Sequence, residues 1–158
     1  NPIEKNIVDY NAFFYPLDAI LNWNKMYGKN GFVQYQFVIP FKNGVANLKR
    51  IMKYIAKSGI SSFLTVLKTF GEVKSPGMLS FPRPGITLAI DFPMSNSKTL
   101  SICNELDEFV KAAGGVLYPA KDARMNGKDF KQFYPNWKEF SQFIDPKFSS
   151  TFWRRVMS

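Results

Sequence analysis

The sequence predicts an α+β fold, with an antiparallel sheet built on a β-α-β-β-α-β core and with helical segments at the C-terminal end. Two stretches have the apolar period of a helix, and each lies between stretches whose side chains alternate as in a strand. This is the split, ferredoxin-like order, in which both helices pack on one face of the sheet. In chain order the expected elements are strand 32–39, helix 44–58, strands 61–70 and 86–92, helix 98–113 and strand 116–119.

The first strand indicates which of its side chains face the helices. An apolar set alternates with a set that contains two amides, Gln34 and Gln36. Because the apolar set fits the helix-covered face, the two amides are expected on the opposite face. The apolar set consists of Val33, Tyr35, Phe37 and Ile39.

Both predicted helices have an apolar stripe and a sequence signal for their ends. Asn43 suits the N-cap of the first helix and Gly59 suits its stop, while Gly114 and Gly115 suit the stop of the second. The side chains expected to face inward are Val45, Leu48, Ile51, Met52 and Ile55 in the first helix, and Leu100, Cys103, Leu106, Phe109, Val110 and Ala113 in the second.

The face of the sheet opposite the helices is expected to mix polar and apolar side chains. Such a face is either the floor of a polar pocket or an outer surface wetted by solvent. The apolar groups among its members favour a covered face. By alternation along three strands, its expected members are Phe32, Gln34, Gln36, Val66, Lys68, Phe70, Thr87, Ala89 and Asp91.

The composition limits the classes of function. The chain has 158 residues and lacks histidine, and its single cysteine is Cys103. Common zinc sites, Ser-His-Asp triads and internal disulfides therefore cannot be built from this chain alone. The chain does not begin with methionine, so it is expected to be a piece of a longer protein. The expected organisation is an irregular, aromatic-rich lead-in (1–31), a split β-α-β domain (32–126) and a helical extension of that domain (127–158).

The net charge of +9 is concentrated in one part of the chain. Seven basic residues and one acid, Glu72, lie between Lys42 and Lys74. Three of these lysines share one face of the first predicted helix, at Lys49, Lys53 and Lys57. This face is either solvated or directed at phosphates or an anionic membrane. The chain itself is expected in the cytoplasm or peripherally at a membrane.

A lysine follows the last predicted strand at a place where a ligand can be held. Lys121 comes just after a short apolar strand and three residues beyond Tyr118. A strand end can hold such a cation rigidly against a ligand. The other interpretation is an exposed lysine in a turn.

Seven short motifs, in this order, resemble the C-terminal part of FAD-linked oxidases of the vanillyl-alcohol-oxidase type. Within that family the resemblance is strongest to the decaprenylphosphoryl-ribose 2-oxidases and weaker to aldonolactone oxidases. The motifs are Phe13-Phe14-Tyr15-Pro16-Leu17-Asp18, Asn22-Trp23-Asn24, Gly31-Phe32-Val33-Gln34-Tyr35-Gln36-Phe37, Ser62-Phe63-Leu64, Leu67-Lys68-Thr69-Phe70-Gly71, Leu79-Ser80-Phe81-Pro82 and Ala120-Lys121-Asp122.

The resemblance implies a substrate (cap) domain whose open sheet face covers the flavin of an N-terminal FAD-binding domain. The implied reaction is hydride transfer from a sugar carbinol to flavin N5, so the flavin carries the chemistry and the protein orients and polarises. The implied substrate is a pentose linked to a lipid phosphate, as in cell-wall polysaccharide precursors. A reductase or epimerase is the implied partner, and nucleic acid is not.

By this resemblance, each site residue of the family corresponds to a position in this sequence. The pocket lysine falls on Lys121, which would face the substrate hydroxyl and the flavin, and the tyrosine near the flavin falls on Tyr118. The pocket glutamines fall on Gln34 and Gln36, and the second lysine on Lys68. The remaining implied substrate-binding positions are Val66, Phe70, Thr87 and Ala89. Thr87 and Ala89 replace an Asn-x-Cys pair of mycobacterial relatives, so the identity of the sugar stays open.

Two other functions compete with this interpretation. An aldonolactone or alditol oxidase would keep the flavoprotein fold. An RNA-binding module would share the β-α-β-β-α-β order and the basic charge. Strand 86–92, however, lacks an aromatic side chain at its middle on which a base could stack, and this argues against RNA.

Overall fold

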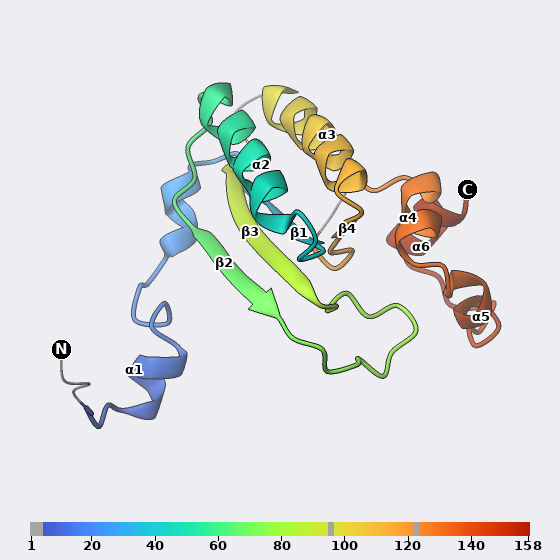
Figure 1. Ribbon diagram of the computed structural model, residues 1–158, viewed down its shortest axis with the longest axis horizontal. Helices are drawn as coiled ribbons and strands as arrows, with labels where there is room; N and C mark the ends of the chain where they lie inside the picture. Colours follow the sequence, from blue (N-terminus) through green and yellow to red (C-terminus); the bar gives the residue numbers. More distant parts are fainter. Residues whose placement is uncertain (1–4, 95–96, 122–123) are drawn as a thin grey trace.

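The computed structural model in Figure 1 describes residues 5–94, 97–121 and 124–158, and of Asn24 and Ser97 only the backbone. Its described residues form a four-stranded antiparallel sheet in the order β2-β3-β1-β4. This is the strand order of the split β-α-β pattern, so the predicted fold class is confirmed. The strands are β1 (Phe32–Ile39), β2 (Thr65–Phe70), β3 (Gly85–Pro93) and β4 (Val116–Leu117).

Two helices, α2 (Gly44–Ser58) and α3 (Ser97–Ala112), cover one face of the sheet (Figure 1). α2 ends at Gly59, whose φ of 72° is accessible to glycine at little cost. Asn43 precedes α2 as predicted, but with a φ of 57° and with no side-chain capping bond to the described residues. The backbone turn at Asn43 thus starts the helix without a capping side chain.

Short helical elements flank the core on both sides. The lead-in contains α1 (Tyr10–Phe14) and a 3-10 turn, η1 (Trp23–Tyr27), and the C-terminal part contains α4 (Gly127–Phe133), α5 (Trp137–Ser141) and α6 (Thr151–Met157). α4 packs on α6, with the ring of Phe130 against the rings of Phe152 and Trp153. Among the described helices, none combines the length and the hydropathy that crossing a bilayer requires.

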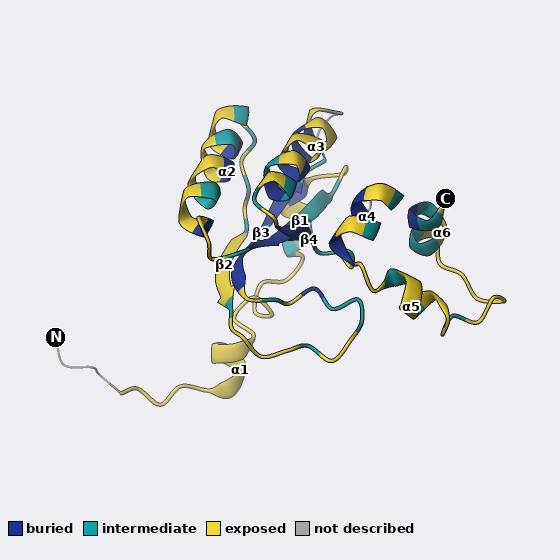
Figure 2. Ribbon diagram, turned by 45° about the vertical axis from the view of Figure 1, so that its right-hand side comes forward, coloured by how far each residue is buried: buried dark blue, intermediate teal, exposed yellow. Residues whose placement is uncertain are grey.

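The main core lies between the sheet and its two helices, as the dark blue interior of Figure 2 shows. The β1–β3 register pairs Tyr35 with Ile90 and Phe37 with Leu88, and directly paired residues share a face. Tyr35 also donates its hydroxyl hydrogen to Asp107 of α3. The apolar set of β1 therefore faces the helices, as predicted.

The helix stripes are narrower than the sequence predicts. Ile51 and Ile55 of α2 are buried, but Val45 and Met52 are 61% and 41% exposed. In α3, Ile102 is buried in place of Leu100, which is 38% exposed. Cys103 is buried in the core, as expected. A helix face at the margin of a sheet loses contact on its outer flank, so only the centre of an apolar stripe is covered.

The strand ends also differ from the prediction. β2 begins at Thr65 instead of residue 61. Just before it, the carbonyl of Leu64 accepts from the hydroxyl of Ser62 as well as from the N–H of Asp91. β4 has two residues instead of four. The N–H of Tyr118 still donates to the carbonyl of Gln36, but Pro119 has no N–H with which to continue the ladder.

Candidate functional site

The face opposite α2 and α3, called the polar face below, gathers the residues that alternation predicted for it. The register pairs Gln34 with Asp91, Gln36 with Ala89 and Val38 with Thr87. It also pairs Val66 with Ala89, Lys68 with Thr87 and Phe70 with Gly85. All these positions share one face, so the glutamines point away from the helices, as alternation predicted.

A buried carboxylate lies at one end of the polar face. Asp91 is 1% exposed and accepts hydrogen bonds from the hydroxyl of Tyr27 at 3.0 Å and the amide of Gln34 at 2.8 Å. Burial, followed by the hydrogen bond to Asp91 and its negative charge, raises the pKa of Tyr27 to about 12. Tyr27 is therefore a hydrogen donor at neutral pH, and it joins the lead-in to the sheet.

A second hydrogen-bonded pair lies at the middle of the polar face. The amide of Gln36 donates to the hydroxyl of Thr87 at 3.2 Å, and that hydroxyl donates to the carbonyl of Phe37 at 2.7 Å. Thr87 is 0% exposed. Its hydroxyl is thus committed within the protein, and its effect on a ligand would pass through the orientation of Gln36.

Three aromatic rings cross the polar face from one edge of the sheet to the other. Phe70 lies on edge strand β2 and Tyr118 follows edge strand β4, while Phe81 lies between them on the connection from β2 to β3. The ring centroids of Phe81 and Tyr118 are 4.5 Å apart in a stacked arrangement, and those of Phe70 and Phe81 are 5.8 Å apart edge to face. This aromatic row buries its end of the face, which explains why Val38 and Thr87 are inaccessible.

Arg83 fastens the connection that carries Phe81. Its guanidinium donates to the carbonyls of Ser80, Phe81 and Phe133 at 3.3–3.4 Å. It also lies 5.5 Å from the ring centre of Tyr134, whose hydroxyl donates to the carbonyl of Leu117. Desolvation by burial lowers the pKa of Arg83 from its ordinary value. The connection, helix α4 and strand β4 are thereby joined beneath the aromatic row.

A second aromatic group closes the other end of the polar face. Tyr27 stacks on Phe32 at 4.3 Å between ring centres and meets Phe63 edge to face at 5.3 Å. The ring centre of Trp23 lies 5.3 Å from that of Phe32. The polar face is thus a strip of amides and a lysine between two aromatic groups.

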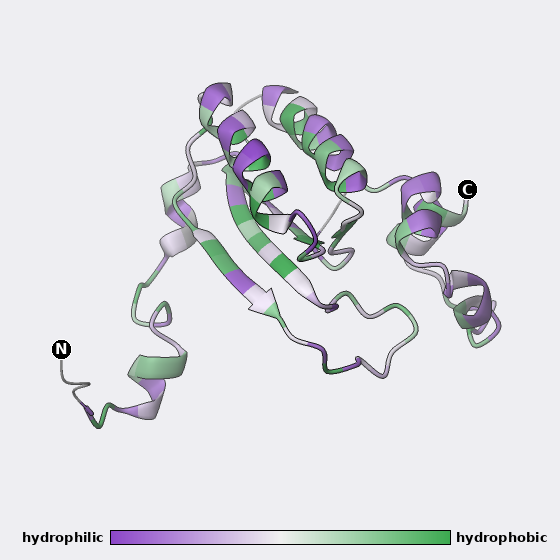
Figure 3. Cartoon of the chain, in the orientation of Figure 1, coloured by the Kyte–Doolittle hydropathy of each residue, from purple (hydrophilic) through white to green (hydrophobic). Residues whose placement is uncertain are grey.

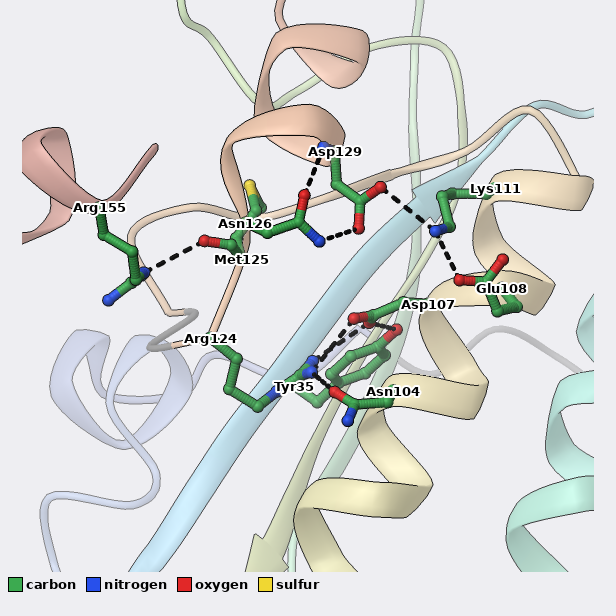
Figure 4. A network of polar contacts seen from close by, with 10 residues as sticks. All are labelled: Tyr35, Asn104, Asp107, Glu108, Lys111, Arg124, Met125, Asn126, Asp129 and Arg155. Carbon is green, nitrogen blue, oxygen red and sulfur yellow. Dashed lines mark hydrogen bonds and ion pairs between the residues drawn. The ribbon is translucent and has the colours of Figure 1, made fainter. Parts of the chain in front are cut away.

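The loop that carries Lys121 is fastened to the opposite side of the sheet. Arg124 makes two hydrogen bonds of 3.1 Å to the carboxylate of Asp107 and one of 2.6 Å to Asn104 (Figure 4). The same carboxylate accepts the hydroxyl of buried Tyr35 at 2.8 Å. This bidentate pair fixes the chain three residues beyond Lys121.

A second ion pair, one turn further along α3, fastens the start of α4 (Figure 4). The ammonium of Lys111 lies between the carboxylates of Glu108 and Asp129. The side-chain amide of Asn126 donates to the Asp129 carboxylate and accepts the backbone N–H of Asp129. Desolvation lowers the pKa of Lys111, but hydrogen bonds to Glu108 and Asp129 outweigh it and raise the pKa. Arg155 donates to the carbonyl of Met125 on the far side of this segment.

Most of the predicted site residues share the polar face, and one lies beyond its edge. Lys121 is half-buried after β4, where its N–H donates to the carbonyl of Tyr118 at 3.2 Å. Within the described residues, nothing bonds its ammonium. Asp122 of the last motif and the side chain of Asn24 lie outside the described part of the chain. The residues gathered on the face are Gln34, Gln36, Val66, Lys68, Phe70, Thr87, Ala89 and Tyr118.

The sequence did not single out four residues that shape this site: Tyr27, Phe81, Arg83 and Asp91. Alternation along β3 places Asp91 on the face, but only the structure shows that it joins Tyr27 and Gln34. Phe81 stands in one of the seven motifs, without any local sign that it crosses the sheet. For Arg83 the available signal was its position between two prolines, which restrict the chain.

Comparison with known proteins identifies relatives of this chain. No family model matches it. The chain is similar to decaprenylphosphoryl-beta-D-ribose oxidase. The identity to that protein of Mycolicibacterium smegmatis is 40% over 149 residues, which covers 91% of this chain and 32% of the oxidase. This similarity confirms the resemblance inferred from the seven motifs.

A further relative is an uncharacterized protein in the mprA 5′ region of Streptomyces coelicolor. It is 34% identical over 114 residues, which covers 69% of this chain and 31% of that protein. The chain therefore spans about a third of the length of each of these two relatives, decaprenylphosphoryl-beta-D-ribose oxidase included.

Proposed function

We propose that this chain is the substrate-facing C-terminal part of a FAD-dependent oxidoreductase that oxidises a sugar carbinol. The proposed sugar is a pentose carried on a polyprenyl phosphate. The similarity to decaprenylphosphoryl-beta-D-ribose oxidase supports the reaction class. The observation that supports the location is the strip of Gln34, Gln36 and Lys68 between two aromatic groups, on the face that α2 and α3 leave uncovered.

The donor set of the polar face fits a ring on which negative charge develops during reduction, and a polyhydroxylated ligand. Its carboxylate, Asp91, is buried and accepts hydrogen bonds from Tyr27 and Gln34. Lys68 is exposed and Lys121 half-buried, so both ammonium groups can reach a ligand. FAD, when bound, would accept the hydride from the carbinol carbon.

Lys121 is the residue proposed to act on the reacting groups. A cation at the end of β4 would stabilise negative charge on the flavin and hold the substrate hydroxyl in position. Tyr118 is proposed to lie against the flavin, with Phe81 stacked behind it as support. The Arg124–Asp107 pair would keep the Lys121 loop in place.

The strip itself is proposed to bind the sugar and its phosphate. The amide of half-buried Gln34 and that of Gln36, which is 7% exposed, each keep a carbonyl oxygen and one N–H for sugar hydroxyls beside their bonds to Asp91 and Thr87. The ammonium of Lys68 is suited to the phosphate. Thr87 would orient Gln36, because its own hydroxyl is already bonded. Val66, Phe70 and Ala89 would form the apolar part of the floor.

Anaerobic reduction of the full-length protein tests this proposal. With FAD bound, a polyprenyl-phosphate pentose should bleach the flavin absorbance, and Gln36→Leu should weaken this more than Gln132→Leu, a change at an exposed position of α4. Bleaching by an aldonolactone or an alditol but not by the lipid-linked sugar would identify the alternative oxidase. The absence of FAD binding by the full-length protein would refute the flavoprotein assignment.

A further inference from the structure

The two helices that cover the sheet differ sharply in charge. They lie side by side in one layer (Figure 1), and Figure 3 shows strongly hydrophilic positions that alternate with apolar ones along α2. α3 carries three acids and two lysines, whereas α2 carries four basic residues and no acid. The basic residues of α2 are Lys49, Arg50, Lys53 and Lys57, and Lys42 precedes them.

The lysines of α2 face solvent and are available to a partner. Lys49, Lys53 and Lys57 are all exposed, and their spacing of four residues places them on one side of the helix. In the part of the chain that the structure describes, none of them forms an ion pair. Their charge is thus unneutralised over about two turns of helix.

Apolar side chains extend this basic surface on one flank of α2. Tyr54 and Arg50 contact Phe109, with the Tyr54 and Phe109 rings 5.2 Å apart, so that side of α2 faces α3. Val45 and Met52 lie roughly half a turn around the axis and therefore face away from α3, toward edge strand β2. They are 61% and 41% exposed.

Edge strand β2 continues the apolar flank. Leu67 pairs with Leu88 on the helix-covered face, but it is 57% exposed because the strand lies at the margin of the sheet. Together these residues form a surface that we call the α2–β2 flank: Lys49, Lys53, Lys57, Val45, Met52 and Leu67.

We propose that the α2–β2 flank docks the protein on an anionic membrane surface. Lysines beside exposed aliphatic side chains suit a bilayer, because the cations meet lipid headgroups while the aliphatic groups enter the boundary below them. A single-stranded nucleic acid would need exposed rings for stacking, and Tyr54, the ring that α2 itself carries, packs on Phe109.

The flank adjoins the polar face through one strand. Val66 and Lys68 alternate with Leu67 on β2, so they lie on the polar face while Leu67 lies on the flank. A lipid-linked substrate held by the bilayer would then pass around a single edge strand to reach the strip. This last consequence rests on the proposed function, whereas the docking itself does not.

Co-sedimentation of the full-length protein with vesicles tests the proposal. The protein should bind vesicles of equal parts phosphatidylglycerol and phosphatidylcholine but not phosphatidylcholine alone. A variant with Lys49→Glu, Lys53→Glu and Lys57→Glu should bind the anionic vesicles on the order of 100-fold more weakly, since each basic residue near such a surface contributes about tenfold or less. The matched control reverses three exposed lysines outside the flank, Lys128, Lys138 and Lys147.

The control variant has the same net charge as the test variant, so equal losses in both would overturn the proposed surface. A second variant, Val45→Ser with Met52→Ser, should lose about tenfold in affinity and become fully dissociable by salt. Tighter binding to polyuridine RNA than to anionic vesicles would also overturn the proposal. Flavin reduction by a detergent-solubilised substrate should be unchanged in all these variants, which separates failure of docking from failure of the proposed oxidase.

Discussion

The two faces of the same sheet are stabilised in different ways. On the helix-covered face, alternate residues of β1 and β3 pack against α2 and α3 in a continuous apolar core. On the polar face, Asp91 and Phe32 bond to and stack with Tyr27 of the lead-in, while Phe81 of the β2–β3 connection stacks on Tyr118 after β4. The first face depends mainly on hydrophobic burial, beside the buried hydrogen bond from Tyr35 to Asp107. The second needs matched hydrogen bonds, and it keeps Lys68 and Gln34 accessible. We propose that one face mainly provides stability and that the other binds the ligand.

The largest expected effect concerns Lys121. In the full-length protein, Lys121→Ala should slow flavin reduction by substrate on the order of 100-fold, about 3 kcal/mol, because one preorganised cation is lost. The temperature of unfolding should stay unchanged, since no described residue bonds this ammonium. Stopped-flow absorbance measures the rate, and Lys128→Ala is the control. A rate within a few-fold of the unchanged protein would remove Lys121 from the site.

A core substitution on the helix-covered face should show the opposite pattern. Leu106 of α3 is fully buried, and Leu106→Ala should lower the free energy of unfolding by about 2–5 kcal/mol. Denaturant titration measures this change. The KM for substrate should stay constant, and only the amount of active protein should fall. A raised KM without loss of stability would contradict the division of roles between the faces.

A smaller effect is expected from Lys68 on the polar face. Lys68→Ala should raise the KM about tenfold and change the rate of flavin reduction little, because it removes a contact present before and during reaction. Steady-state kinetics at several substrate concentrations measures both quantities. Lys74→Ala, at an exposed lysine beyond β2, is the control. A tenfold fall in the rate of flavin reduction with an unchanged KM would instead show that Lys68 acts on the reacting groups.

The smallest expected effect is a loss of stability in alkali. The pKa of Tyr27 is raised from 10.0 to about 12, so the folded state holds its proton more tightly than the unfolded state does. The resulting stabilisation is complete below pH 10 and is lost as the pH rises toward 12. Chemical denaturation between these pH values should therefore show a falling free energy of unfolding, with a shallower fall in Tyr27→Phe. Identical slopes would show that Tyr27 is not the responsible group.

The sequence predicted the elements whose periodicity is strong. The bounds of β1 and α2 agree with the prediction, and the alternation of β1 placed both glutamines on the correct face. The local sequence pattern predicts the face to which a side chain points, because side chains alternate between the two faces along a strand. The width of the α2 stripe was overestimated at Val45 and Met52, since the margin of the sheet depends on tertiary packing.

The contacts that close the ends of the polar face could not be predicted. The bond from Tyr27 to Asp91 spans 64 residues, and nothing in the local pattern of either residue selects the other. The position of Phe81 depends on the path of a connection rich in Pro and Gly, which Arg83 fixes through the carbonyl of Phe133, 50 residues away. The family resemblance supplied the proposed roles of Tyr118 and Lys121, whereas the position of Lys121 after a strand left two interpretations open, a ligand-holding cation and an exposed turn residue.

The exposed edge strand β2 also affects how readily this polypeptide aggregates. It is an edge strand in which five of the six residues are exposed, and the exposed Val66 and Leu67 directly precede Lys68. An edge of this kind can pair with the same edge of another molecule, and a lysine in its middle opposes such aggregation. Lys68 would thus protect the soluble state as well as bind substrate. Preparations of Lys68→Ala should be assayed for light scattering before any loss of turnover is assigned to the site.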